Sequence, residues 1–253
     1  MKLTIKMLMA AAASTAFASG CSQPAPTCLV GRADTSDYSV RYTLKSGDGC
    51  GVTAEALAPV TLSVQKYSGA AQSGQRDIAI RPSSFYDAEN KAPFDGTTIA
   101  TGALTSENPI AEGSQEYCSA PTLAPISTTR GGASTETWTF TKVKFLETAQ
   151  FPGTQVRADI AVSIDACKST YEAVGVWPIV NCSTHNLDTG DANGIDDRLC
   201  DSNFITKNPN DPQVLFNSLN ATFDGRNINS GFKLVCSPTT SACIAASDFP
   251  SIR

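Results

Sequence analysis

The sequence predicts an all-β protein, an antiparallel, β-sandwich-like domain with long loops and about four disulfides. In several segments apolar and polar residues alternate with period two, which is typical of strands with one buried and one solvent-facing side. No segment carries the apolar stripe of an amphipathic helix over four turns. Many short strands separated by turn residues favour a sandwich.

The alternation locates the strands along the chain. It predicts strands at residues 38–45, 60–65, 77–81, 138–145 and 156–165. Within 138–145 the apolar positions change parity after Phe140, and a β-bulge near Thr141–Lys142 would return Val143 and Phe145 to the buried side. Residues 232–244 form a last strand that a turn folds back on itself.

Two segments lack this alternation and are expected to be long loops. Residues 104–135 are rich in Ser, Thr, Pro, Gly and Ala, and residues 177–212 are rich in Asn and Asp. The sequence supports one short helix, at 211–219, with Asp211 as its N-cap and Pro212 in its first turn.

The N-terminus reads as an export signal. Lys2 and Lys6 supply a positive region, and residues 7–17 are apolar over the length of a signal-peptide core, far short of a membrane span. Two processing sites compete. Cleavage before Cys21 requires an acylated cysteine, whereas the A-x-A pattern at residues 16–18 allows ordinary cleavage before Ser19.

The parity of the nine cysteines favours cleavage before Cys21. Ordinary cleavage would leave an odd thiol in an oxidising compartment, whereas acylation of Cys21 leaves eight cysteines to pair. These eight are Cys28, Cys50, Cys118, Cys167, Cys182, Cys200, Cys236 and Cys243.

Ala18-Ser19-Gly20-Cys21 resembles the lipobox of bacterial lipoproteins, although leucine is commonest where Ala18 stands. The resemblance implies a multiply acylated Cys21, palmitate included, and therefore stable anchoring. Ser22 in place of aspartate implies the outer membrane. The expected domains are a signal peptide at 1–20, a lipidated tether at 21–27, and a single β-rich domain at 28–253 with a possible subdivision near 119–134.

The charge of the mature chain excludes one class of partner. Removing residues 1–20 takes away two of the 19 basic residues and none of the 24 acidic ones, which leaves a net charge of −7. Such an acidic chain repels nucleic acid. The expected partners are the membrane, through the lipid, and a protein of the envelope.

Spacing suggests some disulfide pairings. Cys236 and Cys243 flank a turn of six residues, and we predict that they pair across a hairpin. Cys182 and Cys200 bracket the Asp-rich loop and are predicted to close it. Eight cysteines allow about 105 connectivities, so Cys28–Cys50 and Cys118–Cys167 are default pairings only.

The Asp-rich segment at 188–200 is similar to the calcium loops of thrombospondin type 3 repeats and, more distantly, of EF-hands. Hard cations prefer several oxygen ligands at alternate positions, with glycine at the sharp turn. Asp191, Asn193 and Asp197 fall in that order around Gly194, but Cys200 stands where an EF-hand places its glutamate. A disulfide-closed surface loop of Asp and Asn turns, with no cofactor, is the alternative to structural calcium.

No catalytic motif stands out. His185 is the only histidine, no G-x-S-x-G elbow is present, and Cys182-x-x-His185 has no second pair for a zinc site. The preferred function is therefore a non-catalytic envelope lipoprotein that binds a partner protein or supports an envelope assembly. A carbohydrate-binding module and a carboxylate-pair hydrolase are the alternatives. The exposure of five aromatic residues discriminates among them: Trp138, Trp177, Phe85, Tyr86 and Phe216.

Overall fold

The computed structural model describes nine stretches of the chain: residues 37–48, 54–68, 76–87, 92–93, 96–107, 116–130, 134–147, 153–215 and 232–247. The predicted signal peptide, the tether and Cys21 lie outside the described residues. None of the helices in these stretches has the length and apolar character needed to cross a membrane.

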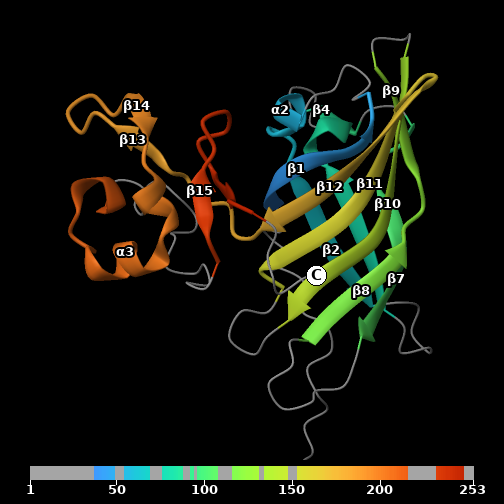
Figure 1. Cartoon of the computed structure of the whole chain (residues 1–253), viewed down its shortest axis with the longest axis horizontal. Helices are drawn as coiled ribbons and strands as arrows, with labels where there is room; N and C mark the ends of the chain where they lie inside the picture. Colours follow the sequence, from blue (N-terminus) through green and yellow to red (C-terminus); the bar gives the residue numbers. More distant parts are fainter. Residues whose placement is uncertain are drawn as a thin grey trace, which may run out of the picture.

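The main body of the described residues is an antiparallel sheet of eight successive strands that closes on itself (Figure 1). In the order in which they are named next, each strand pairs with the one that follows it, and the last strand, β12, pairs back to β1. The eight strands are β1 (Asp37–Gly47), β2 (Leu62–Ser68), β3 (Arg76–Pro82), β7 (Ala100–Glu107), β8 (Glu116–Thr122), β10 (Ser134–Glu147), β11 (Gln155–Ile164) and β12 (Cys167–Val176).

The predicted all-β, antiparallel character is confirmed, but the sandwich is wrong. β10 pairs with β8 through residues 141–147 and with β11 through residues 136–146, so the sheet has no break between two layers. The alternation of apolar and polar residues indicates only that each strand has one buried side. Strands in two packed sheets and strands in one closed barrel both have this property, so the pattern cannot distinguish them.

Short elements extend the barrel wall or lie near one end of the barrel (Figure 1). β9 (Ile126–Arg130) pairs with the first half of β10, and β6 (Gly96–Thr97) pairs with β9. The remaining ones are α2 (Ala54–Leu57), the 3-10 turn η2 (Ser83–Phe85), and the pair of β4 (Tyr86–Asp87) with β5 (Ala92–Pro93).

Side chains fill the interior of the barrel. Its inward positions form one buried cluster in which Trp138 contacts Tyr42, Phe85 and Phe140 ring to ring, with centroids 5.7–6.3 Å apart. Tyr42 donates its hydroxyl to the carbonyl of Val60 at 2.9 Å. Burial raises the pKa of this hydroxyl far above its usual range. The aromatic rings therefore occupy the interior.

The β-bulge predicted near Thr141–Lys142 is confirmed. The register of β10 against β11 shifts between Thr141 and Lys144, and Lys142 has φ 51°. Trp138 and Phe140 before the bulge, and Val143 and Phe145 after it, all face the core. One extra residue therefore keeps both halves of a long strand on the interior side.

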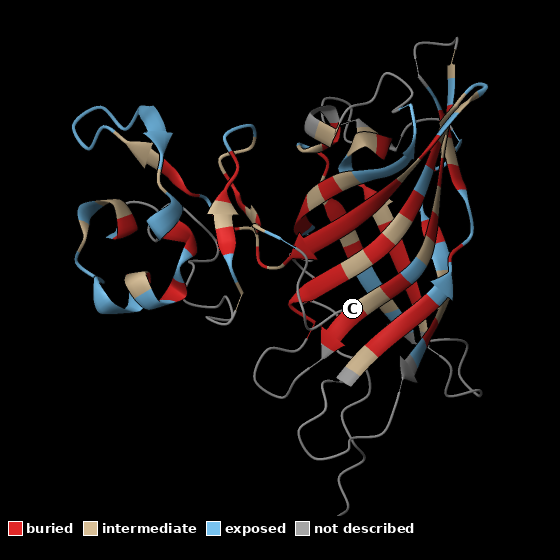
Figure 2. Cartoon of the chain, viewed as in Figure 1, coloured by how far each residue is buried: buried red, intermediate tan, exposed pale blue. Residues whose placement is uncertain are grey.

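After β12 the chain forms a second unit, here called the C-terminal module, made of residues 179–215 and 232–247. It contains β13 (Ser183–His185), β14 (Ala192–Ile195), the 3-10 turn η3 (Asp197–Cys200), α3 (Ser202–Lys207), β15 (Leu234–Cys236) and β16 (Cys243–Ala245). Figures 1 and 2 show it beside the barrel, with the β13–β14 hairpin projecting and exposed along β14.

Strands lie in every segment where the alternation predicts one, including the last hairpin. Residues 212–215 are helical, and Asp211 Oδ1 accepts the amide of Gln213 at 2.9 Å, as the predicted N-cap requires. The predicted long loop at 104–135 is wrong, because β8 and β9 lie within it and pair with β10. The predicted loop at 177–212 contains four short elements: β13, β14, η3 and α3.

Candidate functional site

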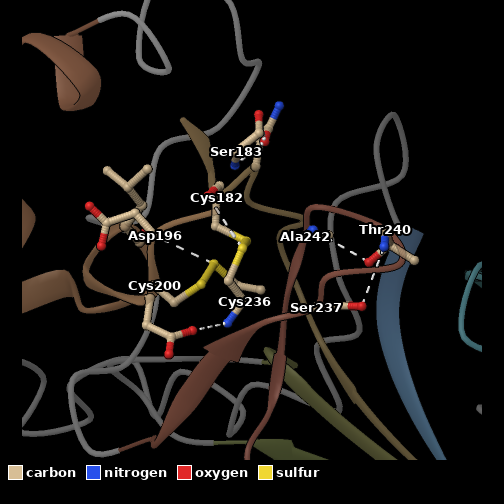
Figure 3. The surroundings of a disulfide bond; sticks show 12 residues. Cys182, Ser183, Asp196, Cys200, Cys236, Ser237, Thr240 and Ala242 are labelled. Carbon is tan, nitrogen blue, oxygen red and sulfur yellow. Dashed lines mark hydrogen bonds between the residues drawn. A yellow bond between two sulfur atoms is a disulfide. The ribbon is translucent and has the colours of Figure 1, made fainter. Parts of the chain in front are cut away.

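Two adjacent disulfides organise the C-terminal module. Cys182 is bonded to Cys236 and Cys200 to Cys243, with Cα atoms 5.7 and 5.5 Å apart (Figure 3). All four cysteines are buried, and the sulfurs of Cys182, Cys200 and Cys243 lie within 4.8 Å of one another. The bonds join the segment before β13 and the turn η3 to the two strands of the last hairpin.

The predicted pairings Cys236–Cys243 and Cys182–Cys200 are therefore wrong. Cys236 and Cys243 do lie opposite each other in the β15–β16 register. Each sulfur bonds instead to a cysteine at one end of the segment 182–200, which packs against the hairpin. Sequence spacing measures closeness along the chain, whereas the pairing depends on how this segment folds over the strands.

Cys118 and Cys167 are also disulfide-bonded, but not to each other. Cys118 lies opposite Phe145, which lies opposite Val156, whereas Cys167 lies opposite Ile164 at the other end of β11. Eight residues of extended strand separate these ends by about 26 Å. Cys28 and Cys50 lie outside the described residues, so two disulfides, not four, have both partners described.

The module packs on the outer side of β12. A second apolar cluster contains Val174 and Val176 of β12 together with all four cysteines of the module. Ser39 of β1 donates its hydroxyl to the carbonyl of Cys243 at 2.6 Å, and this bond is buried. The apolar contact and the buried hydrogen bond fix the module to the barrel wall.

The β13–β14 hairpin projects from this anchored base. Two hydrogen bonds with the side chain of Gln213 hold its first strand: the amide of His185 donates to Oε1 at 2.8 Å, and Nε2 donates to the carbonyl of His185 at 2.6 Å. Leu187 and Ile195 are 51% and 45% exposed on the hairpin. The hairpin therefore presents large apolar side chains on a base that the two disulfides constrain.

The three predicted calcium ligands are engaged in different contacts. Asp197 Oδ1 accepts the backbone amide of Cys236 at 2.6 Å, and Asn193 Oδ1 accepts the hydroxyl of Thr184 at 2.7 Å. The amide of Asp191 donates to the hydroxyl of Thr189 at 3.3 Å. Among the described residues these side chains form no group of three acidic, histidine or cysteine ligands. Structural calcium at this loop stays a prediction.

An ion pair fixes the turn that follows the hairpin. Arg198 donates from Nη2 to Asp196 Oδ2 at 2.6 Å, and its Nε contacts both carboxylate oxygens at 3.0 Å. This side-chain hydrogen bonding lowers the pKa of Asp196 and raises that of Arg198. Asp196 Oδ1 also accepts the amide of Arg198, which caps η3.

Four of the five aromatic residues whose exposure would favour carbohydrate binding lie in the described part of the chain, and these four do not form an exposed row. Trp138 and Phe85 are fully buried, and Trp177 is partly buried against the barrel core. The Tyr86 ring lies under the guanidinium of Arg81, 4.7 Å from its centroid. Phe216 lies outside the described residues. The part of the chain described here thus lacks the aromatic platform of a typical carbohydrate-binding module.

Two carboxylates do lie side by side on the outer face of the barrel. Asp159 of β11 is directly opposite Glu172 of β12. Asp159 pairs with Lys142 at 2.8 Å, and Glu172, which is buried, pairs with Arg157 at 2.7 Å and with Lys45. Cations of this chain thus contact both carboxylates. A glycosidase pair instead needs one protonated acid and a cleft for the sugar.

His185 is half-buried in the hairpin. Its Nε2 lies 3.3 Å from the hydroxyl of Ser183, but that hydroxyl also lies 2.7 Å from Asn181 Oδ1 and donates to it. A serine nucleophile must pass its proton to the histidine. Ser183 and His185 are therefore arranged as members of a hydrogen-bonded turn and not as a nucleophile with its base.

Comparison with known proteins places the chain among bacterial relatives. The family model for MlpA matches residues 36–178, which span the barrel from β1 to the end of β12. A protein of Myxococcus xanthus named "Putative lipoprotein MlpA" is 25% identical over 257 residues, which cover 92% of each chain. No solved structure matches the chain. The C-terminal module lies beyond the family match but within the length shared with this relative.

Proposed function

The chain belongs to the MlpA family, and from this premise we propose that it is a non-catalytic lipoprotein of the cell envelope. Its anchor is an acylated Cys21 in the outer membrane, and its C-terminal module binds a partner protein. The name of the M. xanthus relative and the lipobox-like Ala18-Ser19-Gly20-Cys21 both support the anchor.

The projecting hairpin is the observation that carries the binding role. Leu187 and Ile195 are exposed apolar side chains next to the acidic side chains of Asp188 and Asp191. Burying such residues in an interface removes apolar area from water. The two disulfides limit the conformational freedom that binding would otherwise cost.

The alternatives have less support. The ion-paired Asp159 and Glu172 argue against a carboxylate-pair hydrolase. The burial of Trp138 and Phe85 argues against a carbohydrate-binding module that stacks sugars on a row of these rings.

Fractionation tests the anchor. We expect Cys21→Ala to move the protein from the membrane fraction to the soluble fraction, because the variant cannot be acylated. A matched Ser22→Ala variant keeps the acyl site and should remain in the membrane. Labelled palmitate should enter the wild type and Ser22→Ala only. Equal incorporation into Cys21→Ala would refute the anchor.

Photo-crosslinking in living cells tests the binding role. A benzoylphenylalanine placed at Leu187 or Ile195 should give a discrete adduct with the same protein. The same probe at the exposed Lys168, at the start of β12, is the control. Identical adducts at all three positions, or none at the hairpin, would contradict a partner site on the module.

A further inference from the structure

A hollow lies on the outer face of the barrel, over β2 and β3. Its lining residues are Ser63, Gln65, Tyr67, Ala79, Arg81 and Ile99. Ala79 faces outward, between the inward Ile78 and Ile80, yet it is only 4% exposed. An outward alanine is this well covered because larger neighbours rise around it. Ala79 is therefore the floor of the hollow, and the longer side chains are its walls.

An arginine stands at one wall of the hollow. Arg81 is half-buried, and no acidic side chain among the described residues pairs with its guanidinium. The ring of Tyr86 supports the guanidinium from one face at 4.7 Å. A guanidinium held flat in this way presents a planar fork of N–H donors, the geometry that matches a carboxylate.

Tyr67 and Gln65 line the hollow on β2, and Ile99 lines it just before β7. Tyr67 is 44% exposed and Ile99 is 43% exposed, so both offer apolar surface to a ligand. The hydroxyl of Tyr67 donates to Gln65 Oε1 at 2.9 Å. This bond orients both side chains and leaves the amide N–H groups of Gln65 as donors. Ser63 donates its hydroxyl to Asp37 Oδ1 at the rim.

We propose that this hollow binds one ring of an acidic saccharide, a sugar that carries a carboxylate. The apolar face of the ring packs on Tyr67 and Ile99, the carboxylate meets the fork of Arg81, and the amide of Gln65 donates to a ring hydroxyl. The space between its walls is about 320 Å³ even with the open solvent at its mouth included, so the ligand is limited to a single ring. The proposal is independent of the partner site, because β2 and β3 do not carry the C-terminal module.

Calorimetry with the purified full chain in detergent micelles tests the proposal. The probe is tri-galacturonate, and its neutral counterpart is the matching trisaccharide of galactose, which carries hydroxymethyl groups in place of the carboxylates. We expect tri-galacturonate to bind with a Kd of about 1 mM or tighter, and the neutral sugar to bind at least about tenfold more weakly. Absence of heat with tri-galacturonate up to about 10 mM would overturn the proposal.

Variants assign the roles of the walls. Tyr67→Ala should weaken binding of tri-galacturonate at least about tenfold, whereas Tyr67→Phe keeps the ring and should retain most of the affinity. Arg81→Gln should remove the preference for the acidic sugar, and Arg81→Lys should not restore it, because an ammonium lacks the planar fork. The exposed Leu44→Ala on β1 is the control and should bind as the wild type does.

The outcomes separate a site from non-specific attraction. Each variant is first shown to melt as the wild type does, so that loss of binding does not reflect unfolding. If binding survives both Tyr67→Ala and Arg81→Gln, the ligand lies elsewhere. If the wild type binds the acidic and the neutral sugar with equal affinity, Arg81 does not recognise the carboxylate. Either result would overturn the proposal.

Discussion

Ser39 and Cys243 are 204 positions apart in the sequence, yet the hydroxyl of Ser39 donates to the carbonyl of Cys243 at 2.6 Å in the buried interface between barrel and module. This bond joins β1, the first described strand, to β16, the last one. The same stretch of the C-terminal chain also pairs back to the start of the module, because the amide of Cys243 donates to the carbonyl of Val180.

Removing this hydroxyl should loosen the module. Ser39→Ala leaves a buried carbonyl with one donor fewer, and we expect the free energy of unfolding to fall by about 1–3 kcal/mol. Hydrogen exchange of residues 234–245 should accelerate more than that of the barrel strands. Ser46→Ala, at an exposed position of the same strand, is the matched control and should change stability by less than about 0.5 kcal/mol. Equal effects of the two substitutions would show that the bond contributes nothing.

The connectivity of the module is directly measurable. Peptide mapping of the unreduced protein should give Cys182 linked to Cys236 and Cys200 linked to Cys243. Replacing Cys200 and Cys243 together by serine opens a loop whose ends are 43 residues apart, which costs about 4 kcal/mol in the chain-entropy model. A peptide that links Cys236 to Cys243 would refute the packing of the Asp-rich segment above the last hairpin.

Alternation in the sequence predicts those strands that have one buried face and one solvent-exposed face. β1 and β11 have this environment over most of their length, and their alternation predicts both. β12 differs, because its residues from Tyr171 to Val176 are all buried. Its inward side chains face the barrel core, and Val174 and Val176 face the C-terminal module. A strand covered on both faces has no alternation to detect.

The sequence does not predict β7, and the reason is different. Its inward positions include Ala100 and Gly102, and a Cβ added to Gly102 would approach the Leu123 side chain to 2.7 Å. Small residues are required at these positions because the segment around Leu123 packs against them. β7 therefore lacks the large apolar residues that would reveal a strand. The hollow beneath Arg81 was also invisible in the sequence, because it depends on which residues of β2, β3 and the start of β7 become neighbours.

The buried Glu172 should be important for the stability of the barrel wall. Its side chain is 1% exposed and contacts Lys45 and Arg157. Glu172→Ala leaves two cations facing each other across β12, and we expect a loss of about 1–3 kcal/mol, since both cations keep some solvent contact. The double variant Glu172→Met with Arg157→Met should lose less than the two single variants combined. Additive losses, measured by denaturant unfolding, would exclude coupling between these residues.

Asp196 should make the module sensitive to acid. Hydrogen bonding from Arg198 lowers its pKa in the folded state, so the folded state binds this proton less readily than the unfolded state. The contribution is fully present above the ordinary aspartate pKa of about 3.9 and is lost as the pH falls through the lower folded value. Melting curves between pH 6 and 2 should show a smaller acid-induced loss for Asp196→Asn than for the wild type. Arg198→Met should give the same reduction, and an unchanged pH profile in both variants would contradict the assignment.

Calcium provides the last test, because two of the three predicted ligand oxygens already accept hydrogen bonds. Asp197 holds the amide of Cys236, and Asn193 holds the hydroxyl of Thr184. A cation at these residues would compete with both bonds for the oxygen lone pairs, so we expect the melting temperature to be the same in EDTA and in about 10 mM calcium, well above the weakest extracellular affinities of about 1 mM. Asp197→Ala should lower the melting temperature in EDTA, since it leaves the Cys236 amide without its acceptor, whereas Asp191→Ala should not.

A structural ion predicts the opposite pattern: about 2.7 kcal/mol of stabilisation at 100 times the Kd, present in the wild type and absent in Asp191→Ala. A calcium-dependent rise that Asp191→Ala abolishes would therefore establish the ion and replace the hydrogen-bonded loop as the account of this segment.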